Sequence, residues 1–86
     1  MRLAIPRNVT WKAVKSGVVV LNIEKGIYYT LNETASRVWK LLVEGKSADA
    51  IRKDLGEAYE VEDAALDKDL SEAVAFLKKE SLVEEV

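Results

Sequence analysis

The chain has 86 residues, and 13 lysines and arginines stand against 15 aspartates and glutamates, which gives a formal net charge of −2. This length holds one small domain with a thin core, and a chain of such balanced charge lacks the basic surface that nucleic-acid binders usually carry. Cysteine is absent, which excludes disulfides and fits a cytoplasmic location, and no apolar run approaches the length of a membrane span.

Three strands are predicted in the first third of the chain. Residues 9–15 alternate apolar and polar side chains with the period of two that is typical of a strand. Residues 18–23 are β-branched and nearly all apolar, which predicts a more buried strand, and residues 27–31 form the third. Short connections join the strands into an antiparallel meander. Residues 1–8 form a lead-in that we expect to be partly mobile.

Three helices are predicted after the strands. Asn32 follows the third strand directly and can cap the first helix, because its side-chain oxygen can accept a hydrogen bond from an unpaired amide of the first turn. Gly45 ends this helix, and Ser47 caps the second. The third helix is predicted over residues 62–80, and residues 81–86 are expected to form a tail with a strand fragment.

Each predicted helix carries an apolar stripe that indicates the side facing the core. The stripe residues are Ala35, Val38, Trp39 and Leu42, then Ala48, Ile51, Leu55 and Ala58, then Leu66, Leu70, Ala73, Val74 and Leu77. Trp11 lies on the apolar side of the first strand, so it is predicted to be core, like Trp39. Strands followed by helices predict an α+β fold over residues 1–86, a single winged-helix-like domain in which a three-stranded antiparallel meander precedes three helices.

The sequence offers little for catalysis. Histidine and cysteine are both absent, which removes the usual zinc ligands and the Ser-His and Cys-His pairs, and four glycines form no phosphate-binding loop. Paired carboxylates remain, but we expect them to be solvated near the start of a helix, where the helix dipole favours them. They are Glu60, Glu62, Asp63, Asp67 and Asp69. We therefore predict no catalytic residue, cofactor or metal, and a binding protein instead of an enzyme.

Two adjacent tyrosines mark the third strand as a candidate binding element. Neighbouring strand residues point to opposite faces, so only one of the two can pack inward. We predict that this residue is Tyr29, with Ile27 and Leu31 on the same face. Tyr28 then lies with Thr30 on the other face, either as a half-exposed strand residue or as part of a binding surface.

Phe76 is the second unusual residue. On a helical wheel it stands roughly 100° from Leu77, outside the apolar stripe of the third helix. It lies on the side that carries Ala65, Asp69 and Ala73, where a large apolar residue beside two small ones can line a groove. The alternative is that a neighbouring strand covers it.

These elements together resemble the PqqD family. The run "GVVVLNIEKGIYYTLNETASRVWKLLVEGKSADAI" has the expected strand ending in Leu-Asn, a helix with Val-Trp-x-Leu-Leu, a glycine and a serine-capped helix. The run "YEVEDAALDKDLSEAVAFLKKESLVEE" continues the likeness. The stretch "LNIEKG" departs from the "LYPEG" type of the quinone-pathway proteins and is closer to stand-alone members that serve lasso-peptide or other pathways. Ser81 stands where the family usually has a glycine after the third helix.

The resemblance implies a function and a site. Such domains bind the leader segment of a ribosomally made precursor peptide and present it to a modifying enzyme, such as a radical-SAM protein or a leader peptidase. The leader adds as a strand to the edge of the third strand, against the third helix. The implied peptide-binding residues are Ile27, Tyr28, Tyr29, Thr30, Leu31, Asp69, Ala73 and Phe76.

A second interpretation is open at this point. A small winged-helix fold can also serve as a transcriptional regulator or a dimerisation module. The balanced charge counts against DNA, because the lysines of the helices are interspersed with acids. We therefore expect no specific nucleic-acid partner and no membrane partner.

Overall fold

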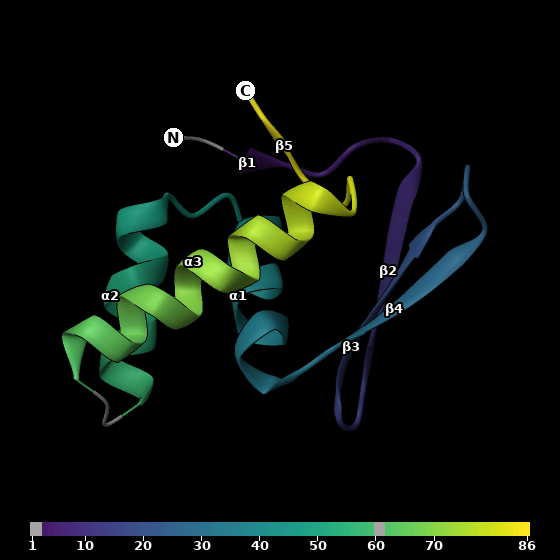
Figure 1. Ribbon diagram of the computed structural model, residues 1–86. Coiled ribbons are helices and arrows are strands. Elements are labelled where there is room, and N and C mark those ends of the chain that lie inside the picture. Colours follow the sequence, from purple (N-terminus) through teal and green to yellow (C-terminus); the bar gives the residue numbers. More distant parts are fainter. Residues whose placement is uncertain (1–2, 60–61) are drawn as a thin grey trace.

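The computed structural model describes residues 3–59 and 62–86 (Figure 1). In chain order the elements are β1 Leu3–Ala4, β2 Val9–Val14, β3 Gly17–Asn22, β4 Ile27–Leu31, α1 Glu33–Val43, α2 Ala48–Ala58, α3 Asp63–Lys79 and β5 Glu84–Glu85. The predicted α+β class is confirmed, with a three-stranded antiparallel sheet followed by three helices. Every predicted strand and helix is present, and the observed bounds lie within one or two residues of the predicted ones.

The main sheet has the order β2-β3-β4, so β3 is central and β4 is an edge strand. Residues 23–26 connect β3 to β4, and Gly26 supplies the positive φ of 68° that this turn needs. The predicted strand fragment in the tail is β5, which pairs with β1 near the two chain ends (Figure 1). The predicted mobility of residues 1–8 stays a prediction: residues 1–2 lie outside the described residues, and Leu3–Ala4 are held in this pairing.

Side-chain caps start two of the helices where the sequence predicted them. Asn32 Oδ1 accepts from the Ala35 amide at 2.8 Å, and Ser47 Oγ accepts from the Ala50 amide at 3.2 Å. Because the cap Asn32 immediately follows Leu31, the last residue of β4, the chain passes from strand to helix without a loop. The start of α1 is therefore fixed at one end of the edge strand.

Helices α1 and α3 end in the same type of turn. After α1, the amides of Gly45 and Lys46 donate to the carbonyls of Leu42 and Leu41. After α3, the amides of Ser81 and Leu82 donate to Lys78 and Leu77 in the same pattern. This is a Schellman motif, which requires a left-handed residue just after the helix. Gly45 adopts φ 83°, and Ser81 adopts φ 60°, an unusual angle for a residue with a side chain.

A buried serine links β3, β4 and α1. The Val18 amide donates to Ser36 Oγ at 3.0 Å, and this hydroxyl donates to the Leu31 carbonyl at 3.1 Å. The Ser36 hydroxyl thus bridges the backbones of β3 and β4 at their paired ends. Gly17 leaves room for it, because a Cβ there would lie 2.7 Å from Ser36 Oγ.

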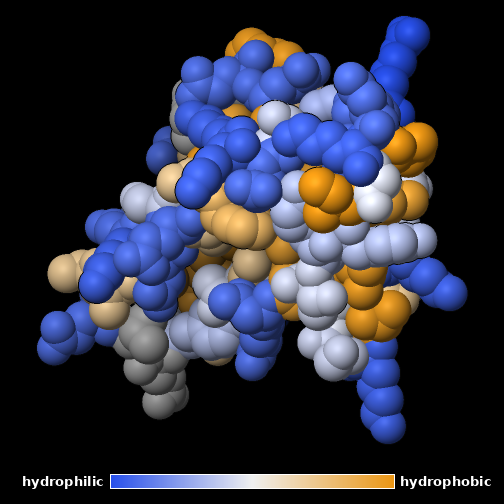
Figure 2. Space-filling view, turned by 45° about the vertical axis from the view of Figure 1, so that its right-hand side comes forward, coloured by the Kyte–Doolittle hydropathy of each residue, from blue (hydrophilic) through white to orange (hydrophobic). Residues whose placement is uncertain are grey.

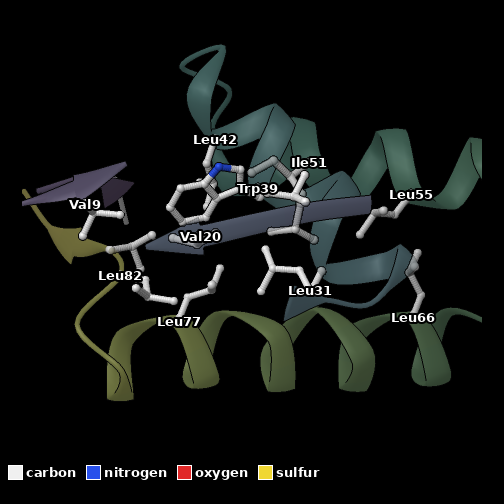
Figure 3. Close-up of a cluster of buried hydrophobic side chains, with 14 residues drawn as sticks. Val9, Val20, Leu31, Trp39, Leu42, Ile51, Leu55, Leu66, Leu77 and Leu82 are labelled. Carbon is white, nitrogen blue, oxygen red and sulfur yellow. The ribbon is translucent and has the colours of Figure 1, made fainter. Parts of the chain in front are cut away.

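The core lies between the inner face of the sheet and the three helices. Figure 3 shows side chains from β3, β4 and all three helices converging on Trp39 and its neighbours. The buried apolar residues are Val9, Val18, Val20, Leu31, Ala35, Val38, Trp39, Leu42, Ile51, Leu55, Leu66, Leu77, Leu82 and Val83. Of the predicted α3 stripe, Leu66 and Leu77 are fully buried, whereas Leu70, Ala73 and Val74 are half-buried.

The structure corrects three predictions of burial, and the first is Ala58, which belongs to the predicted stripe of α2 yet is exposed at the end of that helix. Trp11 is 36% exposed: its ring meets Trp39 edge-on at a centroid distance of 6.5 Å, but β2 is exposed from Thr10 to Val14. Ile27 shares the inner face with Leu31 yet is 46% exposed, because it lies at the far end of β4 from the start of α1. For these two strand residues the face was predicted correctly, but the face is only partly covered at that point.

The carboxylates that the sequence analysis considered for catalysis lie on the surface wherever the structure describes them. Glu62, Asp63, Asp67 and Asp69 are exposed as predicted, and Glu60 lies outside the described residues. Arg52 of α2 pairs with Asp63 and Asp67 of α3. Within residues 3–59 and 62–86, no helix combines the length and the apolar character that crossing a membrane requires.

Candidate functional site

A groove of about 430 Å³ lies between the end of β4, the start of α1 and one side of α3. Its lining residues are Thr30, Leu31, Asn32, Thr34, Ala35, Asp69, Glu72, Ala73 and Phe76. The walls therefore come from segments that are far apart in sequence, and the strand-to-helix junction at Leu31-Asn32 forms one end. Because β4 is an edge strand, the groove opens beside a backbone without a neighbouring strand.

The hydrogen bonds around β3 show which backbone groups of β4 face this open edge. The Leu31 carbonyl points toward β3, where Ser36 Oγ binds it, and the Asn22 carbonyl points toward the β4 side, where it accepts from the Gly26 amide at 2.8 Å. Backbone groups alternate in direction along an antiparallel strand. Leu31 and Tyr29 therefore pair with β3, whereas the N–H and C=O groups of Tyr28 and Thr30 point outward to the free edge.

Phe76 stands at the side of this groove and is held by an aromatic contact. Its ring meets the ring of Tyr29 edge-on, with the centroids 6.0 Å apart, and it is still 42% exposed. The Tyr29 hydroxyl donates to Glu80 Oε1 at 3.1 Å. Partial burial, together with the hydrogen bond and the charge of Glu80, raises the pKa of the Tyr29 hydroxyl above its usual value. The hydroxyl therefore stays protonated at neutral pH, and this contact fixes β4 against α3.

The exposed surface around the edge strand carries further apolar groups. Tyr28 is 70% exposed on the outer face of the sheet, and Ile23 and Ile27 are exposed at the β3–β4 turn. Figure 2 shows hydrophobic atoms as separate patches on a face that is otherwise mostly hydrophilic. A ligand that lies along β4 would thus find apolar contacts on both sides of the strand.

The structure brings together five of the eight residues that the sequence analysis singled out. Thr30, Leu31, Asp69, Ala73 and Phe76 line the groove. Tyr29 supports it through Phe76, whereas Ile27 and Tyr28 lie further along the edge strand and do not line it. Phe76 is 42% exposed, and among the described residues no strand covers it, which decides its alternatives in favour of exposure. Tyr28 is 70% exposed, and its role in a binding surface stays a prediction.

Four lining residues were not predicted. Asn32, Thr34 and Ala35 belong to the first turn of α1, and the direct passage from strand to helix was the signal that could have placed them beside β4. Glu72 lies three residues after Asp69, on the same side of α3. Its spacing from Asp69 and Phe76 was the available signal, but an exposed acid in a helix is usually a solvated one.

A second groove of about 330 Å³ lies on the other side of α3, lined by residues of the three helices together with Leu3 and Lys46. It contains Leu42, Ile51, Leu70 and Val74, and none of the eight predicted residues. Among the described residues, no group of three or more acidic side chains is placed to hold a metal ion. The first groove differs from the second because it lies beside the open edge of β4.

The model of the family described as coenzyme PQQ synthesis protein D (PqqD) matches residues 17–83. The match covers most of the chain, from the start of β3 to the end of the core after α3, so the chain belongs to the PqqD family. No curated protein matches it.

Two solved structures are similar to the whole chain. The first is TbiB1 in complex with the TbiA(beta) leader peptide: it is 29% identical, the match covers 100% of this chain and 98% of that one, and the TM-score is 0.89. The second is a lasso peptide synthetase B1 complexed with the leader peptide, which is 25% identical over 99% of this chain and 100% of that one, with a TM-score of 0.88. Both similar proteins were solved with a leader peptide bound.

Proposed function

We propose that this chain binds the leader segment of a ribosomally made precursor peptide by adding it as a strand to β4. The observation that carries the proposal is the open edge of β4, where Tyr28 and Thr30 point their backbone groups outward beside the groove of α3. Main-chain hydrogen bonds at such an edge provide affinity, and the side-chain pockets beside it provide specificity. The leader complexes of two full-length structural neighbours support the same ligand class.

The chain on its own performs no chemistry under this proposal. It presents the bound leader to a separate peptide-modifying enzyme, such as a radical-SAM protein or a leader peptidase. The absence of histidine and cysteine from the sequence supports a binding role, because most nucleophile–base pairs and transition-metal sites need one of them. The stretch "LNIEKG" supports a stand-alone member that serves a lasso-peptide or other pathway rather than the quinone pathway.

The regulator interpretation is disfavoured. A DNA-binding domain needs a basic face, and the net charge here is −2. The leader-peptide complexes among the similar structures also point to a peptide ligand. A sequence-dependent gel shift at sub-micromolar protein and physiological salt would revive the regulator reading.

A direct test is titration of fluorescein-labelled leader peptide, followed by anisotropy. The first probe is the TbiA(beta) leader, and the second is the N-terminal segment of any short reading frame found beside the gene of this chain. We expect saturable binding by a leader and not by a scrambled peptide of the same composition. A saturating leader should also stabilise the fold, by about 2.7 kcal/mol at one hundred times Kd. A melting temperature that does not change at such an excess would argue against specific binding.

A further inference from the structure

The groove beside β4 has two chemically different ends. One end is apolar, with Phe76 next to the small residue Ala73. The other end carries two carboxylates, Asp69 and Glu72, next to the first turn of α1. If the ligand binds as a strand, the chemical difference between the two ends of the groove selects the side chains that the ligand places at each end. The inference therefore rests on the proposed function.

The edge strand and α3 run in opposite directions along the groove. Tyr29 contacts Phe76 and Glu80 in the second half of α3. Leu31 and Asn32, which follow, line the groove together with Asp69 and Glu72, about one to two helical turns nearer the start of α3. A side chain that faces α3 opposite Leu31 therefore meets the carboxylates, and one opposite Tyr29 meets Phe76.

Asp69 and Glu72 have no hydrogen-bond or ion-pair partner within residues 3–59 and 62–86, whereas the arginines of α1 and α2 pair with Asp54, Asp63 and Asp67 outside the groove. Residues three apart on a helix have their Cβ atoms about 5–6 Å apart, so carboxylates at these positions repel each other. No lysine or arginine lines the groove, so its own residues leave this repulsion uncompensated.

The nearest lysines of α3 do not change this picture. Lys68 precedes Glu72 by four residues and therefore neighbours it on α3, but among the described residues the two side chains form no ion pair. Lys79 lies about two helical turns beyond Glu72. Both are exposed, and neither lines the groove. A cation supplied by the ligand would therefore be the partner that the carboxylates lack, and a charge-assisted hydrogen bond to a carboxylate is among the stronger polar contacts.

We propose that the peptide carries a lysine or arginine that Asp69 and Glu72 bind, followed two residues later by an apolar or aromatic side chain that packs on Phe76 and Ala73. The spacing follows from the strand period of two, because only alternate side chains face α3. The order follows from antiparallel addition, which continues the pairing of the sheet and runs from the Leu31 end toward the Ile27 end.

A peptide library tests this inference. The probe is a phage-displayed library of random dodecapeptides, selected on the immobilised protein. The test variant is Asp69→Asn/Glu72→Gln. The matched control is Glu44→Gln/Glu57→Gln, which removes two exposed charges outside the groove. We expect lysine or arginine with an apolar residue two positions later among binders of the wild type and of the control, and no basic preference with the test variant.

A synthetic peptide from the selection then gives the affinity. We expect the test variant to weaken binding about tenfold, and a Lys→Gln change in the peptide to have the same effect, with no further loss when both changes are combined. Binders without a basic preference, binders with the reverse order, or an unchanged preference with the test variant would overturn the inference and leave the proposed function intact. If neither the wild type nor the control variant enriches any peptide, both the inference and the proposed function fail.

Discussion

At the scale of one residue, substitution of Phe76 tests whether the groove is a binding site or a gap in the packing. A core phenylalanine contributes mainly to stability, whereas an exposed one in a pocket wall contributes mainly to affinity. Phe76 is 42% exposed, and its ring packs edge-on against Tyr29. Its neighbour Leu77 is fully buried and offers an internal comparison on the same helix.

Phe76→Ala should therefore weaken leader binding by about 1 kcal/mol or more and cost less stability than a core truncation. Leu77→Ala should destabilise the fold by about 2–5 kcal/mol. Urea unfolding and peptide titration of both variants measure the two quantities separately. Loss of stability from Phe76→Ala as large as that from Leu77→Ala, with unchanged affinity, would place Phe76 in the core instead.

Ser81 carries backbone strain that the matching turn after α1 avoids. Both turns are Schellman motifs, but Gly45 occupies the left-handed position after α1, and Ser81 occupies it after α3. We expect Ser81→Gly to stabilise the protein by about 1 kcal/mol, because glycine adopts this conformation without a clash of Cβ. Gly45→Ala is the control and should destabilise by a similar amount. Thermal unfolding measures both, and a destabilised Ser81→Gly would contradict the account.

The side chain of Ser36 links two strands to helix α1. Its hydroxyl links the Val18 amide to the Leu31 carbonyl, and both of these residues are buried. Ser36→Ala should cost about 1–3 kcal/mol of stability, because it leaves buried backbone groups without a partner. Thr34→Ala removes a hydroxyl from the half-buried neighbouring turn, with no such link, and should cost less. Equal losses for the two variants in urea unfolding would show that the bridge contributes nothing.

At the scale of the element, β4 is the unit that the proposed function needs. Its inner edge is held by β3, and its Tyr29 side chain is held by α3, so its outer edge is presented as a fixed template. An open strand edge also invites unwanted pairing with other chains. Its exposed tyrosine and isoleucine are therefore costly features to keep unless a ligand covers them.

Thr30→Pro tests the role of this edge. Proline removes the outward amide of residue 30, whereas Thr30→Ala removes only the side chain and keeps the amide. We expect Thr30→Pro to weaken leader binding at least several-fold and Thr30→Ala to change it little. Because the amide points away from β3, neither change breaks a bond within the sheet. Equal affinities for both variants, with the fold confirmed by circular dichroism, would contradict strand addition at this position.

At the scale of the whole molecule, the sequence predicted the order and type of every element except the two-residue strand β1, because the signals for the others are local. Asn32 and Ser47 cap helices in the structure as they do in the pattern, and strand alternation assigned the correct faces to Tyr28 and Tyr29. Alternation does not show whether a face is covered, which is why Trp11 and Ile27 were misplaced. The bridge at Ser36 depends on contacts between distant segments, which no local signal predicts. The spacing of Glu72 from Asp69 and Phe76 was a local signal for its place in the groove, but exposed acids in helices are usually solvated.

The most direct test of the central claim is amide hydrogen exchange of β4, measured by NMR with and without a saturating leader peptide. We predict that the amides of Tyr28 and Thr30 gain protection on binding, whereas the amide of Tyr29, already directed toward β3, changes little. The amide chemical shifts of Ala73 and Phe76 should also change on binding. Saturable binding with no added protection at Tyr28 and Thr30, and with shifts confined to the second groove around Leu70 and Val74, would contradict strand addition to β4.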